Sequence, residues 1–196
     1  MSTTLQDGTG SNIRAKVNDS HELLTKAETL TEYEQGVADG RAFNINDNDK
    51  TVSAVTGEQA ILYVANNSLV DLNLKNLFGS IWDRTAGSKD TNIIRLVQNP
   101  TGGTLISDAS SLTLPNRNFG STNTFSDITA YGATAGGKTL TGQDATPTAF
   151  ITHANGRLFV GIDLVLPAGQ SMGITVESYG GSFDYYIGFA GYKGKS

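Results

Sequence analysis

The chain has 196 residues, a formal net charge of −5 and no cysteine. Disulfides, zinc-thiolate sites and cysteine nucleophiles are therefore excluded, and the 14 basic residues form no run of the kind that binds nucleic acid. The first residues lack the apolar stretch of a signal peptide, and no segment has the length of a bilayer span. We therefore expect a soluble protein that binds neither nucleic acid nor membrane.

Residues 1–49 are polar and predict an N-terminal arm that carries a short helix. Thr31 and Glu34 match a capping box, and Gly40 is suited to end a helix over residues 32–39. The alternative is an irregular arm that becomes ordered only against a partner. In both cases we expect a boundary after residue 49, with residues 50–196 forming a second domain.

Residues 44–49, which read NINDND, offer carboxylate and amide oxygens that suit calcium. Their spacing is not that of an EF-hand, because no glycine stands at the sixth position. Asp and Asn at this density more often form turns. We therefore expect turns here and no metal site.

From about residue 52 the apolar residues follow a period of two, which predicts strands. Residues 60–64 have the composition of a buried strand, and residues 70–75 alternate between apolar and polar side chains. A further strand is predicted over residues 92–97 and ends at Asn99-Pro100.

Residues 99–147 are rich in Gly, Thr, Ser and Asn and predict an insertion with short strands at 104–106 and 111–114. Two interpretations stay open for this insertion. It either only connects two sheets or forms a contact surface presented to neighbouring molecules.

Residues 148–191 predict a four-stranded antiparallel meander. Asn155-Gly156 is a strong hairpin signal, because a type I′ turn needs positive φ at both positions. Later turns at residues 167–169 and 180–181 separate two more alternating segments. His153, beside the Asn-Gly turn, is predicted to be a cross-strand packing residue.

Two short motifs resemble functional signatures. Residues 169–173, GQSMG, have the letters of a hydrolase nucleophile elbow, which requires a helix after the serine and a later histidine. The residues after Gly173 alternate like a strand and both histidines precede Ser171, so we expect Ser171 to be a turn residue. Residues 194–196, GKS, end like a phosphate-binding loop, but Phe189 stands at the position of its first glycine. We expect a solvated basic end instead.

Three acidic residues lie within the predicted C-terminal strands, namely Asp163, Glu177 and Asp184. A glycosidase needs a pair of carboxylates, and the sequence alone does not exclude one. Each acid is out of phase with the apolar stripe of its strand, so all three should point away from the core. The residues therefore predict no catalytic, cofactor-binding or metal-binding site, and no enzyme.

Residues 20–49, SHELLTKAETLTEYEQGVADGRAFNINDND, and the strand AILYVANNS that follows at residues 60–68 resemble head-associated structural proteins of tailed bacteriophages. In these proteins an arm with a GRAFNIN-like segment leads into a jelly-roll-like domain. The stretch LVLPAGQSMGITVES resembles their closing hairpin, whereas residues 99–147 have no counterpart.

The resemblance implies a mainly β chain, with an antiparallel, jelly-roll-like β-sandwich behind the arm. It also implies a non-enzymatic capsid decoration, or cement, protein of the virion, made in the host cytoplasm and without a cofactor. Its expected partners are itself, as a homotrimer, and the major capsid protein or other virion proteins.

Two other functions stay open. The chain is alternatively a collar, tail or fibre component of the same virion, or a carbohydrate-binding β-sandwich module. A carbohydrate-binding module usually needs an exposed aromatic platform. Trp82 is the only tryptophan, so such a platform would also need tyrosines. The candidates are Tyr131, Tyr179 and Tyr192.

Overall fold

The computed structural model describes residues 16–17, 23–24, 30–52, 57–83, 91–107, 110–133, 136, 138–143, 148–153, 156–178 and 182–195. The chain divides into two compact units, Met1–Thr31 and Glu32–Ser196. In the first unit, strands β1 (Lys16–Val17) and β2 (Leu23–Leu24) pair antiparallel.

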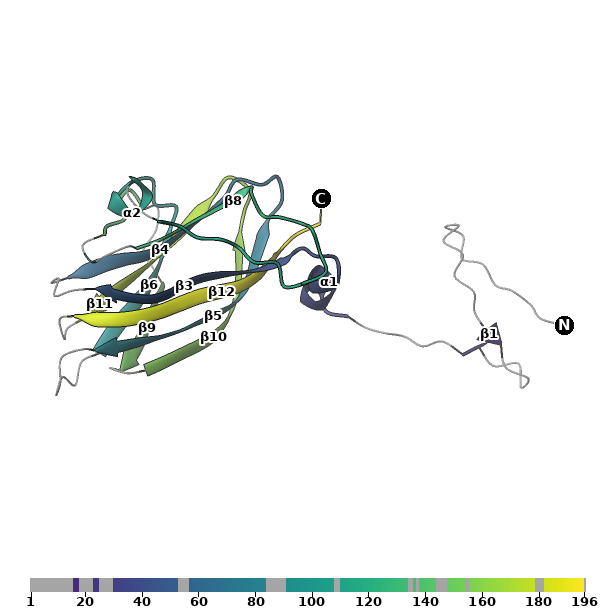
Figure 1. Ribbon diagram of the computed structural model, residues 1–196, viewed down its shortest axis with the longest axis horizontal. Helices are drawn as coiled ribbons and strands as arrows, with labels where there is room; N and C mark the ends of the chain where they lie inside the picture. The colour runs from purple at the N-terminus through teal and green to yellow at the C-terminus, as the bar shows by residue number, and fades with distance from the viewer. Residues whose placement is uncertain are drawn as a thin grey trace. The chain divides into compact units, whose positions relative to one another are not determined.

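Within the described part of the second unit, two antiparallel sheets pack face to face (Figure 1). The four-stranded sheet has the order β10 (Gly156–Leu166), β5 (Leu72–Asp83), β12 (Phe183–Lys193) and β3 (Ala42–Val52). The six-stranded sheet has the order β7 (Ser110–Ser111), β8 (Ile128–Gly132), β4 (Glu58–Asn66), β11 (Ser171–Ser178), β6 (Thr91–Gln98) and β9 (Thr148–His153).

The chain crosses between the two sheets at each step from β3 to β6 and again at each step from β9 to β12, whereas β6 to β9 stay in the six-stranded sheet. Strands β3, β5, β10 and β12 lie in one sheet, and β4, β6, β9 and β11 lie in the other. This alternation is the jelly-roll arrangement. The predicted antiparallel, jelly-roll-like β-sandwich is therefore confirmed.

The predicted C-terminal meander is wrong in its pairing. Strands β9 and β10, on either side of the Asn155-Gly156 signal, do not pair with each other: β9 pairs with β6, and β10 pairs with β5. The alternation of apolar and polar residues only requires that each strand buries one face. That requirement is met equally by a hairpin and by two strands in opposite sheets.

The expected boundary after residue 49 falls inside β3. Phe43 and Ile45 on this strand are fully buried, so the sandwich already includes the GRAFNIN segment. The NINDND residues form part of this strand rather than the expected turns. The short helix is confirmed as α1 (Glu32–Ala38), and Gly40 follows it with a φ of 67°.

The core lies between the sheets and contains one ionisable pair. The Tyr185 hydroxyl donates to Asp47 Oδ2 at 2.6 Å, and both residues are almost completely buried. Burial raises the pKa of the Asp47 carboxyl, and burial together with the adjacent carboxylate raises the pKa of the Tyr185 hydroxyl. Gly132 on β8 faces this carboxylate, and a Cβ there would lie 2.6 Å from Asp47 Cγ.

The insertion at residues 99–147 does more than connect two sheets. A helical turn, α2 (Thr104–Ser107), replaces the strand predicted at 104–106, and β7 (Ser110–Ser111) overlaps the strand predicted at 111–114 only at Ser111. Leu140 packs on Gly173 of β11, on the outer face of the six-stranded sheet. Asn116 forms a bridge with Phe43 at the start of β3.

Candidate functional site

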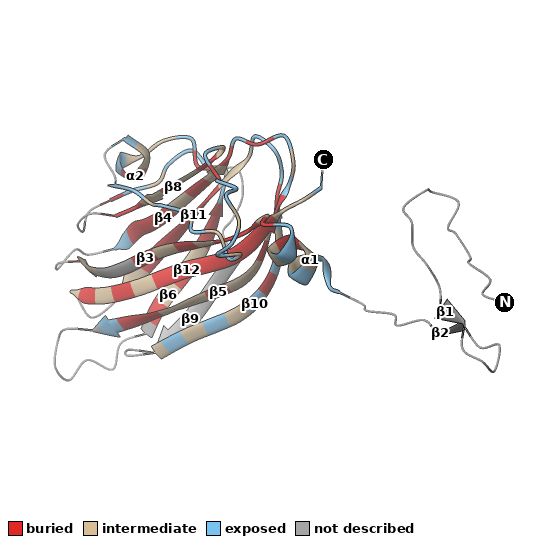
Figure 2. Cartoon of the chain, turned by 45° about the vertical axis from the view of Figure 1, so that its right-hand side comes forward, coloured by how far each residue is buried: buried red, intermediate tan, exposed pale blue. Residues whose placement is uncertain are grey.

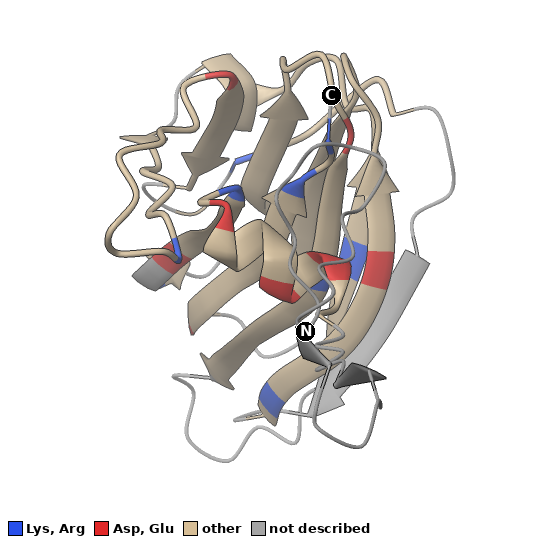
Figure 3. Ribbon diagram, turned by 90° about the vertical axis from the view of Figure 1, so that its right-hand side faces the viewer, with Lys and Arg blue, Asp and Glu red and all other residues tan. Residues whose placement is uncertain are grey.

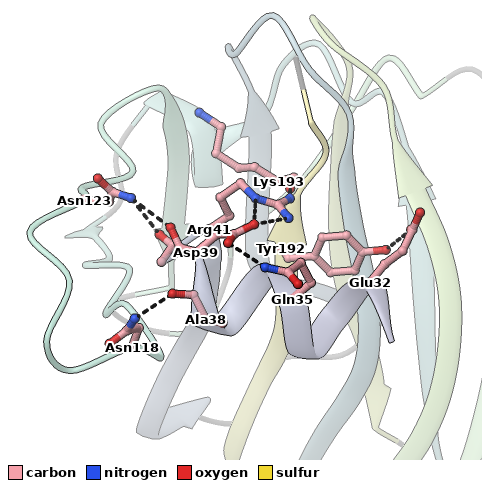
Figure 4. Close-up of polar contacts among 10 residues, drawn as sticks. Glu32, Gln35, Ala38, Asp39, Arg41, Asn118, Asn123, Tyr192 and Lys193 are labelled. Carbon is pink, nitrogen blue, oxygen red and sulfur yellow. Dashed lines mark hydrogen bonds and ion pairs between the residues drawn. The ribbon is translucent and has the colours of Figure 1, made fainter. Parts of the chain in front are cut away.

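One end of the sandwich is built where β3 begins and β12 ends, and α1 packs onto the four-stranded sheet there (Figure 4). Gly36 permits this contact, because a Cβ at this position would lie 3.1 Å from Tyr192 Cβ. The Tyr192 hydroxyl donates to Glu32 Oε2 at 2.9 Å. Tyr192 is therefore buried, and its proposed role in an exposed aromatic platform is wrong.

Arg41 joins the helix to the last residues of β12 (Figure 4). Its guanidinium donates to the Asp39 carboxylate at 3.1 Å and to the Lys193 carbonyl. The side-chain amide of Gln35 donates to the other Asp39 oxygen at 2.7 Å. Both hydrogen bonds lower the pKa of the Asp39 carboxyl, and the bond from Gln35 has the larger effect.

The last residue of β12 and the residue after it are held more tightly than expected. The Lys193 ammonium pairs with the Asp127 carboxylate, and the Gly194 amide donates to the Asp71 carbonyl at 2.8 Å. Among the tail residues that the structure describes, only Lys195 is exposed and fits the expected solvated basic end.

Three asparagine side chains clamp the 116–123 loop onto the carboxyl end of α1, and Figure 4 shows two of them, Asn118 and Asn123. Asn116 donates to the Gly40 carbonyl at 2.8 Å, Asn118 to the Ala38 carbonyl at 3.0 Å, and Asn123 to the Asp39 carbonyl at 3.3 Å. Carbonyls at a helix end have no partner within the helix, so these amides satisfy groups that would otherwise need water. The clamp fixes the loop on the helix.

Two large apolar side chains project from braced loops at this end. Phe119 is 99% exposed and follows Asn118, whose Oδ1 accepts from the Gly120 amide at 3.0 Å. Leu69 is 97% exposed in the loop between β4 and β5, where Asn66 Nδ2 donates to the Val70 carbonyl at 2.9 Å. Apolar groups held rigidly in water are typical of surfaces that contact a partner.

A groove of about 900 Å³ lies beside these loops. Acidic and basic residues are interspersed along the ribbon at this end (Figure 3), and two ion pairs join some of them, Arg41 with Asp39 and Lys193 with Asp127. The groove is lined by residues that follow α1, by loop residues and by the C-terminal residues, namely Asp39, Gly40, Arg41, Leu69, Val70, Thr122, Asn123, Thr124, Phe125, Asp127, Lys193, Gly194 and Lys195. We call this groove, with Leu69 and Phe119, the α1-end surface.

A second exposed surface is the outer face of the four-stranded sheet. Alternate residues of β10 are exposed along the whole strand (Figure 2), and Phe159 among them is 75% exposed. Phe159 lies opposite Phe78 on β5, and the Phe78 ring centroid is 5.8 Å from that of Tyr186 on β12. Trp82 is 41% exposed on β5.

Ser171 lies in a strand instead of the expected turn, whereas the three acids lie where the strand pattern placed them. Ser171 begins β11, so a strand follows where a nucleophile elbow requires a helix. Asp163 pairs with Lys75 at 2.8 Å, Glu177 with Arg95 at 2.6 Å, and Asp184 accepts a hydrogen bond from Thr51 at 2.6 Å. All three acids point away from the core, as predicted.

The remaining expected residues have different outcomes. His153 lies in β9 in register with Thr91, and its side chain lies outside the described residues, as does Tyr179. Asn44 and Asn46 face outward on β3 while Asp47 faces inward, so their oxygens do not converge. Among the described residues, no group of three or more His, Asp or Glu side chains is arranged to hold a metal ion.

Comparison with protein families, with curated proteins and with solved structures finds no match to this chain. None of the helices in the described ranges has the length and hydropathy needed to cross a membrane.

Sequence reasoning missed the exposed aromatic residues, although one signal was present. Phe159 stands among the polar positions of β10, out of phase with the apolar stripe that includes Leu158 and Val160. A large apolar residue out of phase with its strand is expected on the outer face. The clamping asparagines gave no such signal, because their partners lie about 80 residues away in the sequence.

Proposed function

We propose that this chain is a non-enzymatic structural protein of a virion, a decoration protein that stabilises a bacteriophage head by bridging capsid subunits. The observation that carries the proposal is the α1-end surface. Leu69 and Phe119 are almost fully exposed there on loops that hydrogen bonds hold in place. Burying such side chains on a partner loses little conformational entropy, because the loops are already ordered.

The confirmed jelly-roll-like sandwich agrees with the resemblance to head-associated proteins, although many unrelated functions share this fold.

Self-association is part of the proposal. The four-stranded sheet ends at β10 and β3, and edge strands expose backbone groups that can pair with another chain. Residues 115–117 cover only the start of β3, through the hydrogen bonds between Asn44 and Pro115 and between Arg117 and Ala42. We expect a homotrimer in light scattering. A mass that stays at one chain at high protein concentration would contradict this expectation.

Addition of the purified chain to particles that lack it tests attachment. The wild-type chain should sediment with the particles, and the double variant Leu69→Ser, Phe119→Ser should lose most of this binding. The matched control is Phe159→Ser, which removes an exposed ring from a different surface and should bind normally. Equal binding by all three proteins would show that the α1-end surface is not the attachment site.

A further inference from the structure

The outer face of the four-stranded sheet carries a band of aromatic side chains that the core does not use. Phe159 on β10 is directly opposite Phe78 on β5, and Phe78 is opposite Gly188 on β12. The Phe78 and Tyr186 ring centroids are 5.8 Å apart. Trp82, four residues after Phe78 on the same side of β5, extends the band towards the end of the strand. The rings therefore lie on one outer face across three strands, and we call them the aromatic band.

At two positions beside these rings a glycine stands, so no side chain projects from the sheet there. A Cβ at Gly188 would lie 2.9 Å from Phe78 Cε2, so the phenyl ring reaches over the Gly188 backbone. A Cβ at Gly161, two residues after Phe159 on the same exposed side, would meet no heavy atom within 4 Å. The fold therefore does not need a glycine at position 161, and the space above it is open.

Polar groups that can bind hydroxyls alternate with the rings. Asn46 is opposite Gly188, Asn76 is opposite Gly161, and Arg157 is opposite Ser80. Asn46 and Asn76 are partly exposed and Arg157 is exposed, so their side chains can exchange hydrogen bonds with a ligand on this face.

We infer that this face binds a neutral polysaccharide chain. A pyranose ring presents C–H groups on its faces and hydroxyls around its edge, which matches rings flanked by amide and guanidinium groups. A protein partner fits less well, because the cores of protein interfaces are filled by large side chains, whereas glycine and asparagine occupy much of this face. The inference does not rest on the attachment proposed for the α1-end surface.

Titration of the full-length chain with cellohexaose, chitohexaose and mannohexaose tests the inference. Trp82 is the only tryptophan, so its fluorescence reports binding at the band directly, and calorimetry gives an independent affinity. At least one of the three saccharides should bind. Phe159→Ala should weaken that binding about tenfold, since it removes one stacking ring.

Gly161→Thr is the sharper variant, because it fills the open space without displacing an atom of the protein. It should weaken saccharide binding at least as much as Phe159→Ala while the protein stays folded in thermal unfolding. Tyr131→Ala is the control, since it removes a ring that stacks on Tyr63, on the outer face of the other sheet. The saccharide affinity of Tyr131→Ala should equal that of the wild-type protein.

Three results would overturn the inference. One is no binding of any of the three saccharides by either method. Another is binding that persists unchanged in both Phe159→Ala and Gly161→Thr. The third is self-association that Phe159→Ala abolishes in a protein that binds no saccharide, which would assign the face to a second copy of the chain.

Discussion

Gly132 is the residue whose substitution most directly tests the packing of the core. A Cβ at this position would lie 2.6 Å from Asp47 Cγ, inside a sandwich where the carboxylate has little room to move. Gly132→Ala should therefore lower the free energy of unfolding by about 1–3 kcal/mol, the usual cost of overpacking. Gly161→Ala is the matched control, because the space there is open, and it should leave stability unchanged or slightly raised. Urea unfolding measures both, and equal stabilities would contradict the packing described for Gly132.

Asp47 makes stability depend on pH in a defined direction. Burial raises the pKa of its carboxyl in the folded protein above the ordinary value of 3.8. The folded protein therefore holds the Asp47 proton more tightly than the unfolded chain, and this tighter binding stabilises the fold. The stabilisation is complete below about pH 4 and is lost as pH rises through the raised pKa.

Asp47→Asn removes this titration and keeps an oxygen that can accept from the Tyr185 hydroxyl. The variant should gain stability relative to the wild type as pH rises from about 4 towards neutrality. Unfolding curves at several pH values provide the comparison. A difference between the two proteins that stays constant with pH would show that Asp47 is not the group responsible.

At the residue scale, the sequence predicts which side chains face the core but not what lies opposite them. The outward positions of Asp163, Glu177 and Asp184 followed from strand periodicity, and their ion-pair and hydrogen-bond partners are side chains on other strands. The aromatic band depends in addition on register, because Phe159 meets Phe78 only when β10 and β5 pair as they do.

At the scale of elements, β3 decides where the sandwich begins. Phe43 and Ile45 are fully buried, and burial of each side chain stabilises the fold by roughly 1.5–3 kcal/mol. The free energy of unfolding of a whole domain is only about 5–15 kcal/mol. A chain that starts at Lys50 loses both residues and exposes the β12 edge, so it should fail to fold. A chain that starts at Leu30 keeps α1 and β3 and should unfold cooperatively, as judged by circular dichroism. A folded protein from the Lys50 start would mean that β3 is dispensable.

The sequence predicts which segments form strands and helices better than it predicts which strands pair, and the reason is physical. Strands β4 and β6 have dense apolar runs, and α1 has clear end signals, so local residues identify them. In contrast, β3 contains NINDND, in which Asn44 and Asn46 face outward and Asp47 finds its partner only in the folded core. The choice between a hairpin and a crossover to the opposite sheet is made by long-range packing, which local alternation does not encode.

At the scale of the whole molecule, the proposal combines a jelly-roll-like sandwich with an attachment surface at the α1 end. The fold alone does not assign a function. The proposal therefore depends on where the chain is found and on which of its surfaces contacts a partner there.

The most direct test is an averaged density map of the intact particle that carries this chain, with the sandwich fitted into it. The proposal predicts density for the sandwich repeated over the whole capsid lattice, with Leu69 and Phe119 facing the capsid subunits beneath. Density confined to a single ring at the neck or tail, or purified particles that lack the chain altogether, would contradict the assignment as a capsid decoration protein.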